Sequence, residues 1–313
     1  WDPVENASLL PWLISTACIH TSIIQDRRKK LRRLNALLII LSMASTFFAA
    51  YLTRGNVVKS LHAFSGSEVG LPLLVFVLVL MVLAVLAAYL SRAPHPTPMS
   101  PLVSREGLLM LATWLFIALS VVILVATLWP VISSLWSEKP MGLDSPFYNR
   151  TCLPLFGLLG ALLCFCPWLG WKGGIQHKKG FLAVGAIFLV TLVLCVLFGM
   201  RIPLALVSCA FAMSAATGAI LLFACTPSVR RAPASIGACG AHLGAALVVV
   251  AVAWSGPYKA ERTVELALQE SVVVNGYTFT FTKLSTGAEQ NYEFAQAELE
   301  VSKNNEKIGV LEP

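Results

Sequence analysis

The 313-residue chain contains 57% hydrophobic and only 12% charged residues, and its mean hydropathy is +0.76. A soluble protein contains about 25% charged residues, so the composition excludes an ordinary soluble domain and indicates a chain embedded in lipid. The net charge of +7 does not indicate nucleic-acid binding, because most of the excess Lys and Arg residues lie in short loops between apolar runs.

Eight apolar segments follow one another through residues 1–256. Each is close to the roughly 20 residues that a helix needs to cross a bilayer. The expected spans are residues 7–25, 34–53, 72–90, 108–132, 151–171, 181–200, 204–225 and 238–255. The predicted fold class is therefore an all-α polytopic membrane protein with about eight transmembrane helices.

The loops between these spans alternate in charge. One set holds 13 Lys and Arg residues and comprises residues 26–33, 91–107, 172–180 and 226–237. The other set holds five and comprises residues 54–71, 133–150 and 201–203. Basic loops remain on the cytoplasmic side of a membrane. We therefore expect the first set inside and the second set outside.

Residues 257–313 have a different character. Residues 277–282 alternate aromatic and hydroxyl side chains, which is the period-2 pattern of a half-buried strand. Asn275-Gly276 just before them predicts a type I′ hairpin. Further strands are expected at residues 272–274, 297–302 and 308–311. This segment predicts a small β domain on the outer side, after a helical domain of residues 1–256.

The first eight residues are rich in helix-start signals. Asp2 suits the N-cap, Pro3 the first helical position, and Glu5 completes a capping box. The acid, amide and Trp side chains are nevertheless more polar than capping requires. A polar and aromatic row then continues along one side of the first span, at Ser8, Trp12, Thr16 and His20.

Two histidines lie inside expected spans. His20 precedes the first basic loop, and His242 follows Arg231 by eleven residues. A rise of about 1.5 Å per residue puts both imidazoles in the inner half of the bilayer. Ionisable residues inside spans are costly and mark functional sites. Although either residue alone could be an inert hydrogen-bonded histidine, the pair predicts a b-type haem with one imidazole on each face of the iron. Gly240 and Gly244 are expected to let a flat group approach the helix.

A third histidine, His62, lies in an expected outer loop, where a merely solvated role is the alternative. Phe64 nearby suits a ring that stacks on haem, and Arg54 and Lys59 supply cations for haem propionates. The loop therefore predicts one further axial ligand of a haem at the outer surface.

Other chemical signatures are absent from the sequence. None of the eight cysteines stands in a CxxC or CxxCH motif, so we expect buried thiols. His95 and His177 lie in inner loops and are expected to be solvated. The absence of GxSxG, P-loop, HExxH and GxGxxG motifs in plausible settings disfavours a protease, an ATPase or a nicotinamide enzyme. We assign no catalytic residue.

The segment Trp1–Ser8, followed by Pro11-Trp-Leu13, resembles the second half of the WWD motif of haem-handling proteins in its CcmF/NrfE form. This WWD remnant covers residues 1–13. Further matches follow in the order of the family at residues 16–20, 53–64, 104–106, 147–149 and 241–244. The resemblance covers essentially the whole chain.

The resemblance implies roles for particular residues. His20 and His242 match the axial ligands of a permanent haem b, and His62 matches an external ligand of haem in transit. The implied haem surface of the WWD motif consists of Trp1, Asp2 and Trp12. A second external histidine is expected upstream of Trp1 and a closing span after Pro313.

The resemblance also implies a function in cytochrome c maturation, as a haem lyase subunit that is active only as a full-length complex. Such a subunit promotes thioether formation between haem and the CxxCH cysteines of apocytochrome c. The other implied partners are a periplasmic haem chaperone, further maturation subunits including apocytochrome-binding thioredoxin-like proteins, quinol and the lipid bilayer. The implied location is the bacterial inner membrane, with the haem-handling face and the β domain in the periplasm.

Two other functions are compatible with membrane histidines. A b-type haem quinol oxidoreductase subunit without lyase activity would use the histidine pair, but it gives no reason for residues 1–8 or for the His62 loop. A transporter that uses buried histidines would need polar residues in several spans, whereas residues 72–90, 108–132 and 181–200 are almost uniformly apolar.

Overall fold

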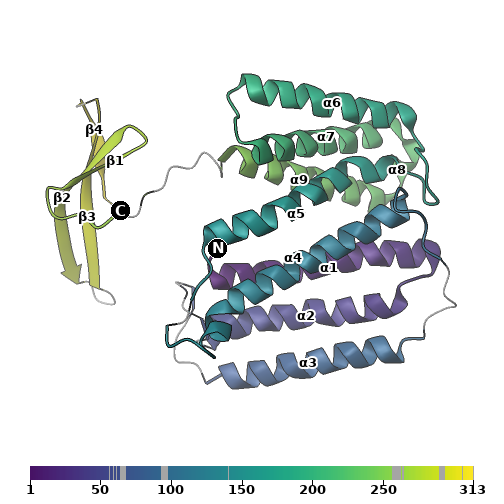
Figure 1. Ribbon diagram of the computed structural model, residues 1–313, viewed down its shortest axis with the longest axis horizontal. Coiled ribbons are helices and arrows are strands. Elements are labelled where there is room, and N and C mark those ends of the chain that lie inside the picture. The colour runs from purple at the N-terminus through teal and green to yellow at the C-terminus, as the bar shows by residue number, and fades with distance from the viewer. Residues whose placement is uncertain are drawn as a thin grey trace. The chain divides into compact units, whose positions relative to one another are not determined.

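The computed structural model describes the chain except for residues 56, 59, 61, 64–67, 93–97, 140, 256–261, 263, 289–292, 305 and 313. The chain divides into two compact units, Trp1–Ala253 and Trp254–Pro313. The first unit is helical and the second consists of strands (Figure 1). Each unit is described by itself below.

Eight helices of the described chain are long and apolar enough to cross a membrane, which confirms the expected number of spans. They are α1 (Pro3–Arg28), α2 (Arg32–Arg54), α3 (Gly70–Leu90), α4 (Arg105–Ser133), α5 (Ser145–Phe165), α6 (Lys178–Leu197), α7 (Pro203–Cys225) and α9 (Pro233–Ser255). The 3₁₀ turn η1 (Cys166–Trp168) extends α5, and the short helix α8 (Pro227–Arg231) precedes α9.

Helix α1 is longer at both ends than the apolar segment that predicted it, because caps rather than hydropathy set its limits. The Asp2 carboxylate accepts the backbone N–H of Val4 at 2.9 Å, and Pro3 occupies the first helical position. At the other end Lys29 adopts a left-handed conformation with φ 55°, which ends the helix. The helix thus begins directly after the polar residue Asp2 and continues into the basic segment of residues 26–33.

The helices pack side by side around two centres. Helix α1 lies against α2 and α4, while α7 lies against α5 and α6 (Figure 1). The first centre consists of side chains from α1, α2, α4 and α5, among them Leu13, Leu38, Leu119, Ile123 and Cys152. Leucines and valines on the outer faces of α3 and α6 are exposed, as expected for helices that contact lipid.

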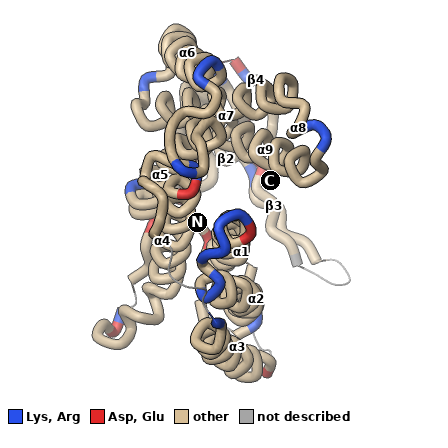
Figure 2. Tube along the Cα trace, turned by 90° about the vertical axis from the view of Figure 1, so that its right-hand side faces the viewer, with Lys and Arg blue, Asp and Glu red and all other residues tan. Residues whose placement is uncertain are grey.

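A buried ion cluster joins the basic ends of the helices. Glu106 is fully buried and accepts bonds from Lys30 Nζ at 2.6 Å and from Arg28 Nε at 3.0 Å. Arg105 donates to the Pro167 carbonyl of η1 at 2.6 Å and so connects the end of α5. These contacts bring two of the basic loops, residues 26–33 and 91–107, together with the end of α5. Figure 2 faces this end and shows Lys and Arg gathered on the loop between α1 and α2.

The Glu106→Gln change is expected to lower the free energy of unfolding by about 3–5 kcal/mol, because Lys30 would be left buried without a counter-charge. The matched control is Glu300→Gln, which removes a partner of Lys307 on the exposed surface of the sheet. That change should cost about 0–1 kcal/mol. Thermal unfolding of the full-length protein in detergent would compare the variants, and equal midpoints would contradict the prediction.

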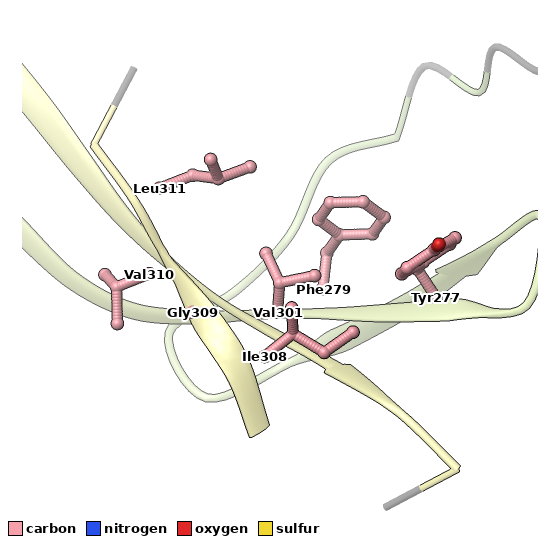
Figure 3. A pocket seen from close by; sticks show the side chains of 7 residues that line it. All are labelled: Tyr277, Phe279, Val301, Ile308, Gly309, Val310 and Leu311. Atoms are coloured by element: carbon pink, nitrogen blue, oxygen red, sulfur yellow. The ribbon is translucent and has the colours of Figure 1, made fainter. Parts of the chain in front are cut away.

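The second unit is a four-stranded antiparallel sheet in the order β1-β2-β3-β4. Its strands are β1 (Ser271–Val274), β2 (Tyr277–Ala288), β3 (Glu293–Lys303) and β4 (Glu306–Leu311). Asn275 and Gly276 have φ of 50° and 80°, as a type I′ turn requires, so the predicted hairpin is confirmed. The sheet carries an apolar pocket lined by Tyr277, Phe279, Val301, Ile308, Gly309, Val310 and Leu311 (Figure 3).

Candidate functional site

The two membrane histidines lie side by side, although 222 positions separate them in the sequence. The ring centroids of His20 on α1 and His242 on α9 are 6.3 Å apart, and their planes meet at 84°. Metal–imidazole bonds are about 2 Å long, so a metal between two imidazoles separates the ring centroids by roughly 6 Å. The spacing of the pair therefore fits an iron bound by both rings.

Both histidines are held in the same tautomer. The Nδ1 of His20 is 2.7 Å from the Thr16 carbonyl, and the Nδ1 of His242 is 2.7 Å from the Ala238 carbonyl. A carbonyl oxygen only accepts, so in each neutral ring Nδ1 carries the hydrogen and Nε2 carries the lone pair. This is the arrangement by which proteins prepare histidine for a metal. The donor set therefore fits a bis-imidazole haem.

The residues around the histidine pair are apolar, and those beside His242 are small. Phe116 of α4 lies 5.6 Å from the His20 ring. Gly240 and Gly244 each stand two positions from His242, and two residues along a helix correspond to a rotation of about 200°, so both lie on the side of α9 away from the imidazole. Both glycines face open space on the other side of α9. The positions that share the His242 face are instead the small residues Ala238, Ala245 and Ala246.

The loop that carries His62 follows the C-terminal end of α2 and meets the N-terminal start of α1. Ser60 Oγ donates to Asp2 Oδ1 at 2.7 Å and accepts the backbone N–H of His62 at 3.0 Å. His62 Nδ1 lies 3.6 Å from the same Asp2 oxygen. The imidazole is about half exposed, whereas Asp2 is mostly covered. Asp2 and His62, two of the sequence-predicted residues, are thus brought together.

Apolar packing explains why this loop reaches α1. Val58 of the loop is buried with Ala7 of α1 and Leu52 of α2. Ala7 is fully buried, so the first turns of α1 and the end of α2 form a small core under the loop. Burial of these side chains holds Ser60 and His62 above the N-terminus of α1.

Trp1 forms the aromatic part of the outer surface. Its ring stacks on Tyr148 of α5, with centroids 4.5 Å apart and planes 5° apart. The Tyr148 hydroxyl accepts a bond from the buried Asn6 amide at 3.1 Å. Asp144, the N-cap of α5, accepts the Phe147 N–H at 3.3 Å and sets the start of the helix that carries Tyr148. Trp1 is therefore supported by α5 and remains 40% exposed on its other side.

The other predicted site residues lie elsewhere. Trp12 is ten positions below Asp2, a rise of about 15 Å along α1, and its ring contacts Phe116 at 6.1 Å. Trp12 therefore lies along α1 between the histidine pair and the group formed by Trp1, Asp2, Ser60 and His62, here called the outer cluster. Arg54 is the exposed last residue of α2. Lys59, Phe64 and His95 lie outside the described residues, and His177 immediately precedes α6.

The structure adds residues to which the sequence assigned no role: Ser60, Phe116, Tyr148 and Asn6. Tyr148 belongs to residues 147–149, which match the family pattern in the sequence, but that match assigned them no function. Phe116 lies in an almost uniformly apolar span, so its sequence gives no signal. A buried amide such as Asn6 requires a hydrogen-bond partner, and that requirement could have indicated a polar neighbour near the outer end of α1.

The chain is similar to known proteins in both sequence and fold. A family profile described as the CcmF C-terminal beta-sandwich matches residues 257–313. The chain is 30% identical to cytochrome c-type biogenesis protein CycK of Bradyrhizobium diazoefficiens, over 100% of the chain and 50% of that protein. It is 29% identical to cytochrome c-type biogenesis protein CcmF of Escherichia coli, over 99% of the chain and 49% of that protein.

The fold is likewise similar to a solved structure named Cytochrome c Heme Lyase CcmF, with a TM-score of 0.68 and 22% identity. That similarity covers 100% of this chain and 49% of the solved one. The chain spans about half the length of the curated relatives it matches. The profile and the curated relatives show that the chain belongs to the CcmF/NrfE family of cytochrome c-type biogenesis proteins.

Proposed function

We propose that this chain forms the haem-handling part of a haem lyase that attaches haem to apocytochrome c. The observation that carries the proposal is the His20–His242 pair, two imidazoles 6.3 Å apart with the same nitrogen available to a metal. The relatives named cytochrome c-type biogenesis proteins and the solved structure named a heme lyase support the reaction class.

In this proposal His20 and His242 hold a resident haem b between α1 and α9. Their Nδ1–H bonds to Thr16 and Ala238 orient both rings and leave Nε2 for the iron. A haem b held there supplies one-electron redox chemistry, for which quinol is the proposed reductant. Phe116 beside the His20 ring and the buried Ala246 of α9 make this part of the surroundings apolar.

The outer cluster binds the haem that is the substrate. His62 supplies one axial nitrogen, Trp1 offers an exposed ring, and Arg54 is the proposed propionate contact. The two cysteine thiols of a CxxCH segment then add across the two haem vinyl groups. Each addition forms one C–S bond and moves the thiol hydrogen to the neighbouring vinyl carbon, so the step consumes no external electrons.

The proposed partners follow from this reaction. Apocytochrome c supplies the thiols, a periplasmic haem chaperone supplies the haem, and thioredoxin-like maturation subunits present the apocytochrome. The eight apolar helices then lie in the bacterial inner membrane, with Trp1 and His62 on the periplasmic side and the basic loops in the cytoplasm.

Complementation tests the proposal against the oxidoreductase alternative. The full-length protein would be expressed in Escherichia coli cells that lack their own CcmF, together with a c-type cytochrome. Covalent haem would be detected on denaturing gels, and b haem by the reduced-minus-oxidised spectrum of the purified protein. Restored covalent haem supports a lyase. A b-type spectrum without covalent haem would instead support the quinol oxidoreductase.

A further inference from the structure

We propose that Asp2 is a positioning residue for His62: its carboxylate accepts the His62 Nδ1–H and so directs Nε2 toward the iron of the incoming haem. The inference rests on the proposed role of His62 as an external haem ligand. It assigns Asp2 a role through His62, rather than as part of an aromatic haem surface.

The Asp2 carboxylate is fixed before any ligand arrives. Its Oδ1 accepts the Val4 N–H at 2.9 Å and the Ser60 hydroxyl at 2.7 Å. One donor belongs to the first turn of α1 and the other to the loop that carries His62. Because both bonds end on one oxygen, the carboxylate cannot rotate without losing a helix cap and a loop contact.

His62 is held over this oxygen by its backbone as well as by its ring. Its N–H donates to Ser60 Oγ at 3.0 Å, and its Nδ1 lies 3.6 Å from Asp2 Oδ1. That separation is an ion-pair contact rather than a formed hydrogen bond. Bonds of this kind are often long before the substrate binds and shorten in the complex. A small rotation of the imidazole, which is about half exposed, closes the gap.

The acceptor character of Asp2 suits this role. The oxygen that faces His62 already accepts two hydrogen bonds, from the Val4 N–H and from the Ser60 hydroxyl, as a carboxylate oxygen does. A carboxylate that accepts the second N–H of a metal-binding histidine orients the ring and raises its basicity.

The test uses two changes that preserve the start of α1. Asn and Ser are both good N-caps, so Asp2→Asn removes the charge and Asp2→Ser also removes the oxygen that faces His62. The matched control is Glu68, an exposed carboxylate of the same loop just before α3. Purified full-length protein that already holds its b haem would be titrated with haemin and followed by difference absorbance.

We expect the Asp2→Asn and Asp2→Ser variants to bind external haem about 10-fold and about 100-fold more weakly than the wild type, the usual range for the partner of a metal-binding histidine. Glu68→Gln and Glu68→Ser should bind as the wild type does. In a His62→Ala background the Asp2 changes should have no further effect, because the two residues act as one unit. The b-haem spectrum reports that each variant is folded.

Two results would overturn the inference in different ways. If the Asp2 variants bind haemin within twofold of the wild type while His62→Ala loses binding, Asp2 does not position the ligand and the proposed function stands. If His62→Ala itself binds haemin normally, the external site and the role of Asp2 fall together.

Discussion

Replacement of His20 or His242 by alanine is expected to abolish the b-type absorbance of the full-length protein. Each ring supplies one axial nitrogen in the proposed pair, and each ring is locked by its own backbone carbonyl. The ring centroids are 6.3 Å apart. Loss of either imidazole would therefore leave the iron with one protein ligand and without its second axial nitrogen. The measurement is the reduced-minus-oxidised spectrum of protein purified in detergent, where the sharp α band should disappear.

A control and a contrary result make this prediction decisive. His177→Ala, in the loop before α6, should retain the full spectrum because His177 lies outside the pair. A normal bis-imidazole spectrum in either His20→Ala or His242→Ala would show that another residue binds the iron. A featureless spectrum from folded, haem-replete wild-type protein would remove the haem pair altogether and favour the transporter alternative.

Replacement of His62 by alanine is expected to block cytochrome c maturation and to leave the b haem in place. His62 lies on the outer loop beside Asp2 and Ser60, whereas His20 lies twelve positions below Ser8 along α1. The two sites are therefore physically separate, and loss of one ligand should not disturb the other. Covalent haem on a co-expressed c-type cytochrome should fall to the level of cells without the protein, while the α band is retained.

Glu68→Ala is the control for the same loop, since Glu68 is an exposed residue just before α3. Cytochrome c maturation by the Glu68→Ala protein should equal that by the wild type. Unimpaired maturation by the His62→Ala protein would reduce His62 to a solvated loop residue. Loss of both maturation and b haem would show that the two sites are coupled, contrary to their separation along α1.

The membrane spans and the hairpin could be predicted from the sequence because their causes are local. A run of apolar residues forms a helix in lipid whatever its neighbours are, since all backbone groups must bond within the segment. Asn275-Gly276 likewise adopts positive φ angles that few other pairs tolerate. The helix limits were less accurate, because caps such as Asp2 and Lys29 extend α1 beyond its apolar run.

The depth of His20 and His242 could also be counted along the chain, since helix rise is fixed at about 1.5 Å per residue. Their separation could not, because it depends on how α1 and α9 are rotated and packed. The same holds for Gly240 and Gly244, whose depth can be counted along the chain but whose open surroundings depend on how α9 packs. Rotation about a helix axis is set by contacts with other helices.

The class of the protein, its spans and its sheet thus follow from local patterns in the sequence. Only the tertiary structure brought Asp2 to Ser60 and His62, Trp1 to Tyr148, and His20 to His242. Each of these contacts joins segments far apart in the chain. Such contacts form when buried side chains such as Ala7, Leu52 and Val58 pack together, and no local pattern records which distant residues that packing will bring together.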